Sequence, residues 1–221
     1  MGMKSKVSEK GGGERILAPE GPTAAICYQV IYLGHQETTF NGTTSWKPKF
    51  RFTFELPEHK HVFKEEEGEQ PLVVSVEHND SLNPKSNMYK FLKQWFPKKD
   101  MSEGADVDYS KLAGKKALIS IVHNSGKGSN AGNVYANLGT IMPLPAGMAC
   151  PDKPDNEIVI YDVDEHDEAV FEALPEFLRN KILASREMKE GHADVHAAAS
   201  NVADDTFGEG GGSADDDEEV F

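Results

Sequence analysis

The chain has 221 residues, 38% of them hydrophobic, and carries 23 Lys and Arg against 37 Asp and Glu. Its longest apolar stretches, residues 117–122 and 26–33, are far too short to cross a bilayer, and no apolar core follows the basic N-terminus as a secretory signal requires. Because Cys27 and Cys150 also lack the spacing of a metal site or a disulfide framework, we expect a cytoplasmic protein with no membrane partner, metal or cofactor.

The charge is distributed unevenly along the chain. Residues 1–149 carry 18 Lys and Arg against 16 Asp and Glu, whereas residues 150–221 carry 5 against 21, which gives formal charges of +2 and −16. The net charge of −14 would argue against a nucleic-acid partner, but only the second part of the chain carries it. The first 149 residues therefore keep nucleic-acid binding open.

The chain begins with a polar arm and continues with β-type sequence. Residues 1–14 include a run of three glycines and are predicted to be disordered. Segments rich in β-branched and aromatic residues, separated by glycine, proline and polar loops, predict five strands. These strands are expected at residues 25–33, 46–56, 72–78, 116–122 and 134–141.

One helix is predicted between the third and fourth strands. Asn83 is a plausible N-cap followed by Pro84, and the helix ends at Pro97. Its apolar stripe consists of Met88, Phe91, Leu92 and Trp95. Three strands, a helix and two strands predict an OB-fold over residues 15–148, a five-stranded Greek-key barrel whose second and third strands hold oligonucleotides.

The remaining chain is expected to contribute little to the core. Residues 149–190 contain several prolines and short helical patterns, so they are predicted to be a linker with short helices packed weakly or not at all. Residues 191–221 are predicted to be a disordered acidic tail. The fold class is thus mainly β.

The second strand carries the residues most suited to nucleic acid. Positive charge follows a phosphate backbone and aromatic rings stack on bases, so we predict a single-stranded-DNA site at Trp46, Lys47, Lys49 and Arg51. Phe50, Phe52 and Phe54 occupy the other face and are assigned to the core. Further candidates are the stacking residues Tyr28 and Tyr135, the helix residues Lys90 and Lys93, and Lys127 of a glycine-rich loop without phosphate-loop spacing.

The C-terminus combines an acidic run with two apolar residues. A charged run alone would only be solvated, but a terminal apolar anchor with a free carboxylate suits capture in a small basic-rimmed pocket of a partner. The predicted partner-binding residues are Asp215, Asp216, Asp217, Glu218, Glu219, Val220 and Phe221. The same polyanionic run could also occupy the barrel's basic groove when DNA is absent.

Short segments at residues 17–21, 27–34, 54–57, 86–87, 112–115 and 135–137 resemble a family of bacteriophage OB-fold single-stranded-DNA-binding proteins. The tail is similar to those of bacterial and phage single-stranded-DNA-binding proteins, which end in an acidic run and Phe. The resemblance implies a role in phage DNA replication, recombination and repair in the host bacterial cytoplasm. It also implies that the tail contacts a polymerase, helicase or primase. The chain departs from the pattern after Ala149, where the segment is longer and more helical than a plain linker.

Two other functions stay open at this point. The same groove would permit an RNA-binding OB module, and a barrel that holds no nucleic acid would be a protein-interaction module. The sequence has no nucleophile or dinucleotide motif, so we predict no enzyme, and a nuclease would need metal-dependent cleavage. Oligomeric state is also open, a homo-oligomer included.

Overall fold

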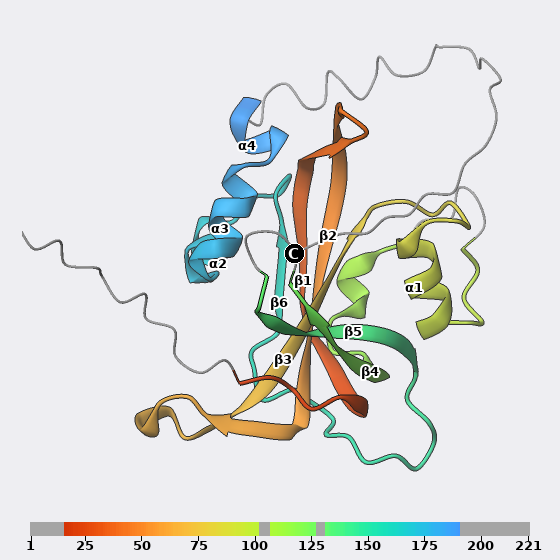
Figure 1. The fold of residues 1–221 in the computed structure, drawn as a ribbon, viewed down its shortest axis with the longest axis vertical. Helices are drawn as coiled ribbons and strands as arrows, with labels where there is room; N and C mark the ends of the chain where they lie inside the picture. The colour runs from red at the N-terminus through yellow and green to blue at the C-terminus, as the bar shows by residue number, and fades with distance from the viewer. Residues whose placement is uncertain (1–15, 102–106, 127–130, 191–221) are drawn as a thin grey trace, which may run out of the picture.

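The computed structural model describes residues 16–101, 107–126 and 131–190, and in them the chain is mainly β (Figure 1). The predicted arm, Lys127 and the acidic tail lie outside the described residues. The strands are β1 (Gly21–Phe40), β2 (Thr43–Val62), β3 (Glu69–Asn79), β4 (Lys116–Ser125), β5 (Val134–Pro143) and β6 (Val159–Asp162). Two short 3-10 helices also occur, η1 (Glu65–Glu67) and η2 (Tyr109–Leu112).

The six strands form one sheet that is open. The hydrogen-bonded order is β3-β2-β1-β4-β5 with antiparallel neighbours, and β6 pairs in parallel with β1. β3 and β5 approach each other but are not paired, so the expected closed barrel is not formed among the described residues. The five predicted strands are confirmed, although β1 and β2 are each 20 residues long and extend well beyond their predicted ends.

The helix α1 (Asn87–Trp95) packs against one side of this sheet. Its N-cap is Ser86, whose hydroxyl accepts a hydrogen bond from the Tyr89 amide at 3.1 Å, and not Asn83, whose side chain accepts from Lys85 in the preceding turn. The four residues of the predicted apolar stripe are all buried. The helix is therefore where the sequence predicts it, but its first turn begins later.

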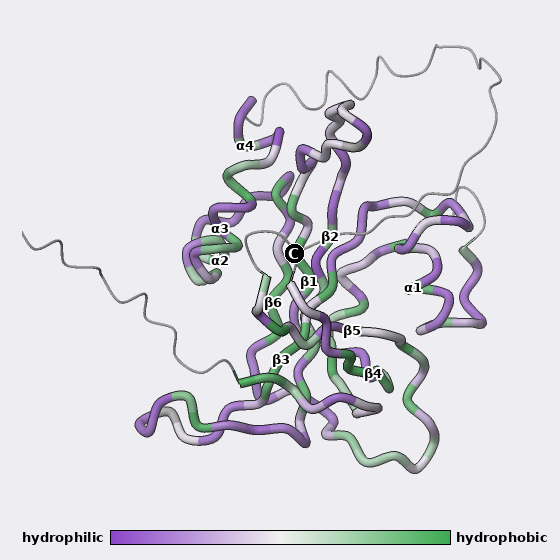
Figure 2. The backbone as a smooth tube through the Cα atoms, in the orientation of Figure 1, coloured by the Kyte–Doolittle hydropathy of each residue, from purple (hydrophilic) through white to green (hydrophobic). Residues whose placement is uncertain are grey.

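The first hydrophobic core lies between α1 and the sheet. Phe52 and Phe54 are fully buried there, which confirms their assignment to the core. Trp95 packs against Phe54 and donates its indole N–H to the Lys116 carbonyl at 3.0 Å, so the helix is also tied to β4. Figure 2 shows hydrophobic segments of several strands meeting near the centre of the view.

A second core lies on the other side of the β1–β2 pair, where the C-terminal segment packs (Figure 1). It joins β1 to β6, α2 (Glu168–Ala173) and α3 (Glu176–Leu183), and α4 (Arg186–Glu190) follows. Ile31 and Leu33 of β1 are fully buried against Leu178 and Ile182 of α3. The short helices were predicted, but the expectation that they pack weakly is wrong, because their apolar faces complete this core.

Two buried carboxylates fasten the C-terminal segment to the sheet. Glu55 of β2 accepts hydrogen bonds from the backbone amides of Asp155 and Asn156 at 2.9 and 2.8 Å. Glu187 of α4 accepts from the His35 amide at 2.9 Å and lies 2.5 Å from the His35 Nδ1 atom. Both carboxylates are about 1% exposed, so removing either set of donors would leave a buried charge unpaired.

None of the helices in the described ranges is long and apolar enough to span a membrane.

Candidate nucleic-acid interface

An open groove of about 1220 Å³ lies where the sheet is not closed. Its walls come from β3 on one side and from the start of β5 and the end of β4 on the other. The start of α1 and the preceding loop bound one end, and β2 contributes Lys47, Pro48 and Arg51. The groove thus exists because β3 and β5 stand at opposite ends of the strand order and are not hydrogen-bonded to each other.

The groove is cationic and polar, in contrast to the chain as a whole. Four cationic side chains line it, from Lys47, Arg51, Lys85 and Lys90, against the two carboxylates of Glu77 and Asp80. Both carboxylates are engaged. Glu77 pairs with Arg51 at 2.9 Å and with Lys181, while Asp80 accepts a hydrogen bond from the Tyr109 hydroxyl at 2.7 Å. Five amide side chains complete the polar lining, from Asn79, Asn83, Asn87, Asn124 and Asn137.

Three residues of the groove hold buried polar atoms that have no hydrogen-bond partner among the described residues. These atoms are Arg51 Nε, His78 Nε2 and Asn79 Oδ1. Buried polar atoms in folded proteins nearly always have a partner, because an unmade hydrogen bond costs about 1 to 3 kcal/mol. All three residues line the groove, so this is where the described part of the fold leaves several buried polar atoms unmatched.

His78, which lines the groove, makes the stability of the folded protein dependent on pH. Burial lowers the pKa of His78 to about 4, with the nearby Lys49 ammonium acting in the same direction and the Glu77 carboxylate opposing it. The unfolded chain therefore binds this proton near pH 6.5, whereas the folded chain does not until about pH 4. Stability from this group is fully present above pH 6.5 and is lost as the pH falls toward 4.

We expect this loss to amount to roughly 2 to 3 kcal/mol in the free energy of unfolding, at about 1.4 kcal/mol per pKa unit. Denaturant unfolding of the wild type and of His78→Gln between pH 7.5 and 4 measures it. The substitution removes the titrating group, so the variant should lose less stability over this range. Equal losses in both proteins would show that other groups govern the acid limb.

Four of the predicted binding residues line the groove. Lys47 and Lys90 are exposed, and Arg51 and Tyr135 are half-buried. Lys47 and Arg51 come from β2, Lys90 comes from α1, and Tyr135 stands at the start of β5. Two of the residues predicted on β2, Lys47 and Arg51, therefore line the same groove as Lys90 of α1 and Tyr135 of β5.

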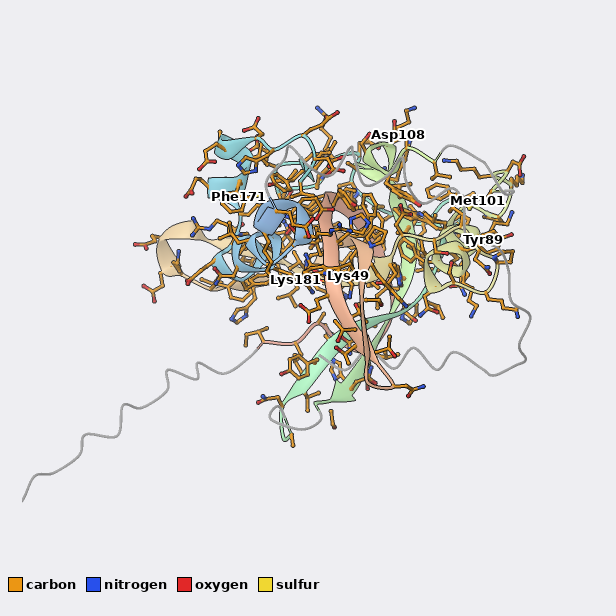
Figure 3. The ribbon with its side chains drawn as sticks, turned by 90° about the horizontal axis from the view of Figure 1, so that it is seen from above. Lys49, Tyr89, Met101, Asp108, Phe171 and Lys181 are labelled. Atoms are coloured by element: carbon orange, nitrogen blue, oxygen red, sulfur yellow. The ribbon has the colours of Figure 1, made fainter. Side chains whose placement is uncertain are left out.

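The other predicted residues lie elsewhere. Lys49 is only 7% exposed and does not line the groove; Figure 3 labels it on the β1–β2 part of the sheet, together with Lys181 of α3. Trp46 lies under the Lys189 ammonium at 5.1 Å, and Tyr28 is half-buried near Arg51 and Glu55. Lys93 donates to the carbonyls of Pro97 and Lys99 and so closes the end of α1. Helix α3 and β6 cover this face, so it is not the open surface that the sequence predicted.

No family model, curated protein or solved structure matches this chain. The groove must therefore be interpreted from its own chemistry. It offers cations for phosphates, amide donors and acceptors for base edges, and Tyr135 as a ring. Residues 16–101, 107–126 and 131–190 contain no group of three or more His, Cys, Asp or Glu side chains placed to hold a metal ion.

The sequence did not single out several residues of the groove. His78 and the amide residues come from β3, the loop before α1, α1, β4 and β5, and only the fold brings them together. The sequence predicts Asn83 only as a helix cap and His78 only as the last residue of the third strand. The one available signal was the excess of Asn around the predicted third strand and helix, which a hydropathy pattern does not weigh.

Proposed function

We propose that this protein binds single-stranded DNA without sequence preference in the groove between β3 and β5. The observation that carries the proposal is the groove's composition, which is cationic and rich in amides in a chain of net charge −14. Binding to single strands requires cations for the phosphates together with rings for the bases, and their combination is tolerant of sequence. Tyr135 and the four groove cations supply both.

We also propose that the sheet is an OB-type Greek key left open between its third and fifth strands. The order β3-β2-β1-β4-β5 with a helix between β3 and β4 supports this proposal. In OB-folds, oligonucleotides bind across strands two and three between two hairpin loops. Here the groove includes residues of β2 and β3 and reaches the end of β4 and the start of β5.

On this proposal the protein coats single strands during phage replication, recombination and repair. Recruitment of a polymerase, helicase or primase would fall to residues 215–221, and this part of the proposal rests on the sequence alone. RNA is the second candidate ligand, because the amide-lined groove could equally accept a 2′-hydroxyl.

The test is fluorescence anisotropy of a labelled oligo-deoxythymidine at several salt concentrations, with matched oligo-uridine and duplex DNA as competitors. Binding that weakens with salt and is displaced poorly by duplex and RNA supports the proposal. Preference for the uridine oligomer would favour the RNA module. Absence of binding to all three would leave a protein-interaction module.

Tyr135 gives a specific prediction for the same assay. Replacing it with Ala should weaken binding about tenfold, because base stacking contributes about 1 to 3 kcal/mol per base. Tyr135→Phe is the matched control, since it keeps the ring and should bind within about twofold of the wild type. If the Phe variant loses as much affinity as the Ala variant, the hydroxyl and not the ring carries the contribution.

A further inference from the structure

Helix α3 presents an aromatic side chain beside the groove. Phe177 is 57% exposed, more than any other large hydrophobic residue in the described part of the chain. Its ring lies 5.3 Å from the guanidinium of Arg51, and Arg51 lines the groove. Burial normally removes a Phe ring from water, so this exposure requires an explanation.

The surroundings of Phe177 are charged. One turn further along α3, the Lys181 ammonium meets the Glu77 carboxylate, which already pairs with Arg51. Lys189 of α4 lies over the ring of Trp46, which precedes the groove residue Lys47 in the sequence of β2. The C-terminal segment thus adds one ring, Phe177, and two ammonium groups, those of Lys181 and Lys189, on the β2 side of the groove.

An exposed ring beside a guanidinium suits a nucleotide. The Arg51 guanidinium lies 5.3 Å from the ring, and Lys181 stands one turn further along the same helix. A base can stack on an aromatic face while its phosphate meets the neighbouring cations. The Arg51 guanidinium lies over the Phe177 ring, yet 57% of Phe177 is still exposed to solvent.

We propose that α3 extends the binding surface and that Phe177 is a stacking platform for a base that leaves the groove past Arg51. This inference rests on the proposed function. It assigns to residues 176–183, which the sequence placed in a linker, a direct role in holding the strand.

The test compares Phe177→Ala with Phe63→Ala in the full chain. Phe63, which follows β2 on the connection to β3, is a matched control because it is 55% exposed, contacts His61 and does not line the groove. Anisotropy is measured with two oligo-deoxythymidines, one of about 4 nucleotides, near the lower limit for one OB-type site, and one of about 12. Thermal unfolding of both variants is measured in parallel.

We expect Phe177→Ala to weaken binding of the longer oligomer about tenfold and of the shorter one less than twofold, with Phe63→Ala unchanged for both. Phe177→Trp should retain affinity and show fluorescence quenching by the longer oligomer. Equal losses for both oligomers would place the effect in the groove through Arg51 and overturn the platform. Wild-type affinity of Phe177→Ala for the longer oligomer would overturn it while leaving the proposed function intact. Failure of the wild type to bind either oligomer would instead reject the proposed function.

Discussion

A chain that ends at Pro151 is expected to be largely unfolded under conditions where a chain that ends at Glu190 is folded. The shorter chain lacks β6 and α2–α4, so Ile31 and Leu33 of β1 lose the residues that bury them completely. Exposing each of these side chains costs about 1.5 to 3 kcal/mol. Glu55 of β2 also loses the three hydrogen bonds that it accepts from residues 155 and 156. The sum is comparable with the whole stability of a typical domain, about 5 to 15 kcal/mol. Circular dichroism and denaturant unfolding of the two chains measure the difference.

A milder comparison in the full chain tests the same core. Ile182 is fully buried and its neighbour Leu183 is 48% exposed, so the two residues form a matched pair on α3. Ile182→Ala should lower the free energy of unfolding by about 2 to 5 kcal/mol and Leu183→Ala by less than about 0.5 kcal/mol. Equal effects, or a chain ending at Pro151 that unfolds at the same denaturant midpoint as the longer one, would show that the C-terminal segment is a linker after all.

Neutralising Lys85 and Lys90 together should weaken oligo-deoxythymidine binding by roughly ten- to thirtyfold at 0.1 M salt. Both ammonium groups line the groove from the α1 end, and each phosphate contact on a single strand adds about 0.7 to the slope of log K against log salt. The double variant Lys85→Ala and Lys90→Ala should therefore lose about 1.4 from this slope. Affinity measured at four or more salt concentrations gives both quantities.

The matched control replaces Lys98 and Lys99, which are exposed beyond the other end of α1 and do not line the groove. It changes the net charge of the protein by the same amount. If both double variants lose equal affinity, the attraction is a general effect of charge and the groove is not the site. A loss of affinity that occurs only in the Lys85 and Lys90 double variant would place the bound DNA in the groove, beside α1.

Local sequence pattern was sufficient for the first core. Strict alternation over Phe50, Phe52 and Phe54 identified the inward face of β2, and the spacing from Met88 to Trp95 identified the buried face of α1. The helix start was misplaced because Asn83 and Pro84 form a turn of their own before the real cap at Ser86. Both motifs use the same residue types, and only tertiary contacts decide between them.

The outer face of β2 could not be predicted because distant residues cover it. Arg51, Thr53 and Glu55 are polar and so indicated solvent, yet Thr53 and Glu55 are buried and hydrogen-bonded. The covering strand β6 is only four residues long and pairs in parallel with β1 at a distance of more than 120 residues along the chain. No local signal marks such a strand. The groove likewise depends on β3 and β5 lying apart, which is a property of the whole sheet.

The pairing of β1 with β6 has a consequence for synthesis. Residues 29–32 of β1 leave the ribosome more than 120 residues before their parallel partner at residues 159–162 and the helices that follow it. Until then one edge of β1 and its apolar face stay open to other chains, which is the situation that favours aggregation. Completion of the fold is therefore tied to translation of the C-terminal segment, and nascent chains arrested before residue 159 should require a chaperone to stay dispersed.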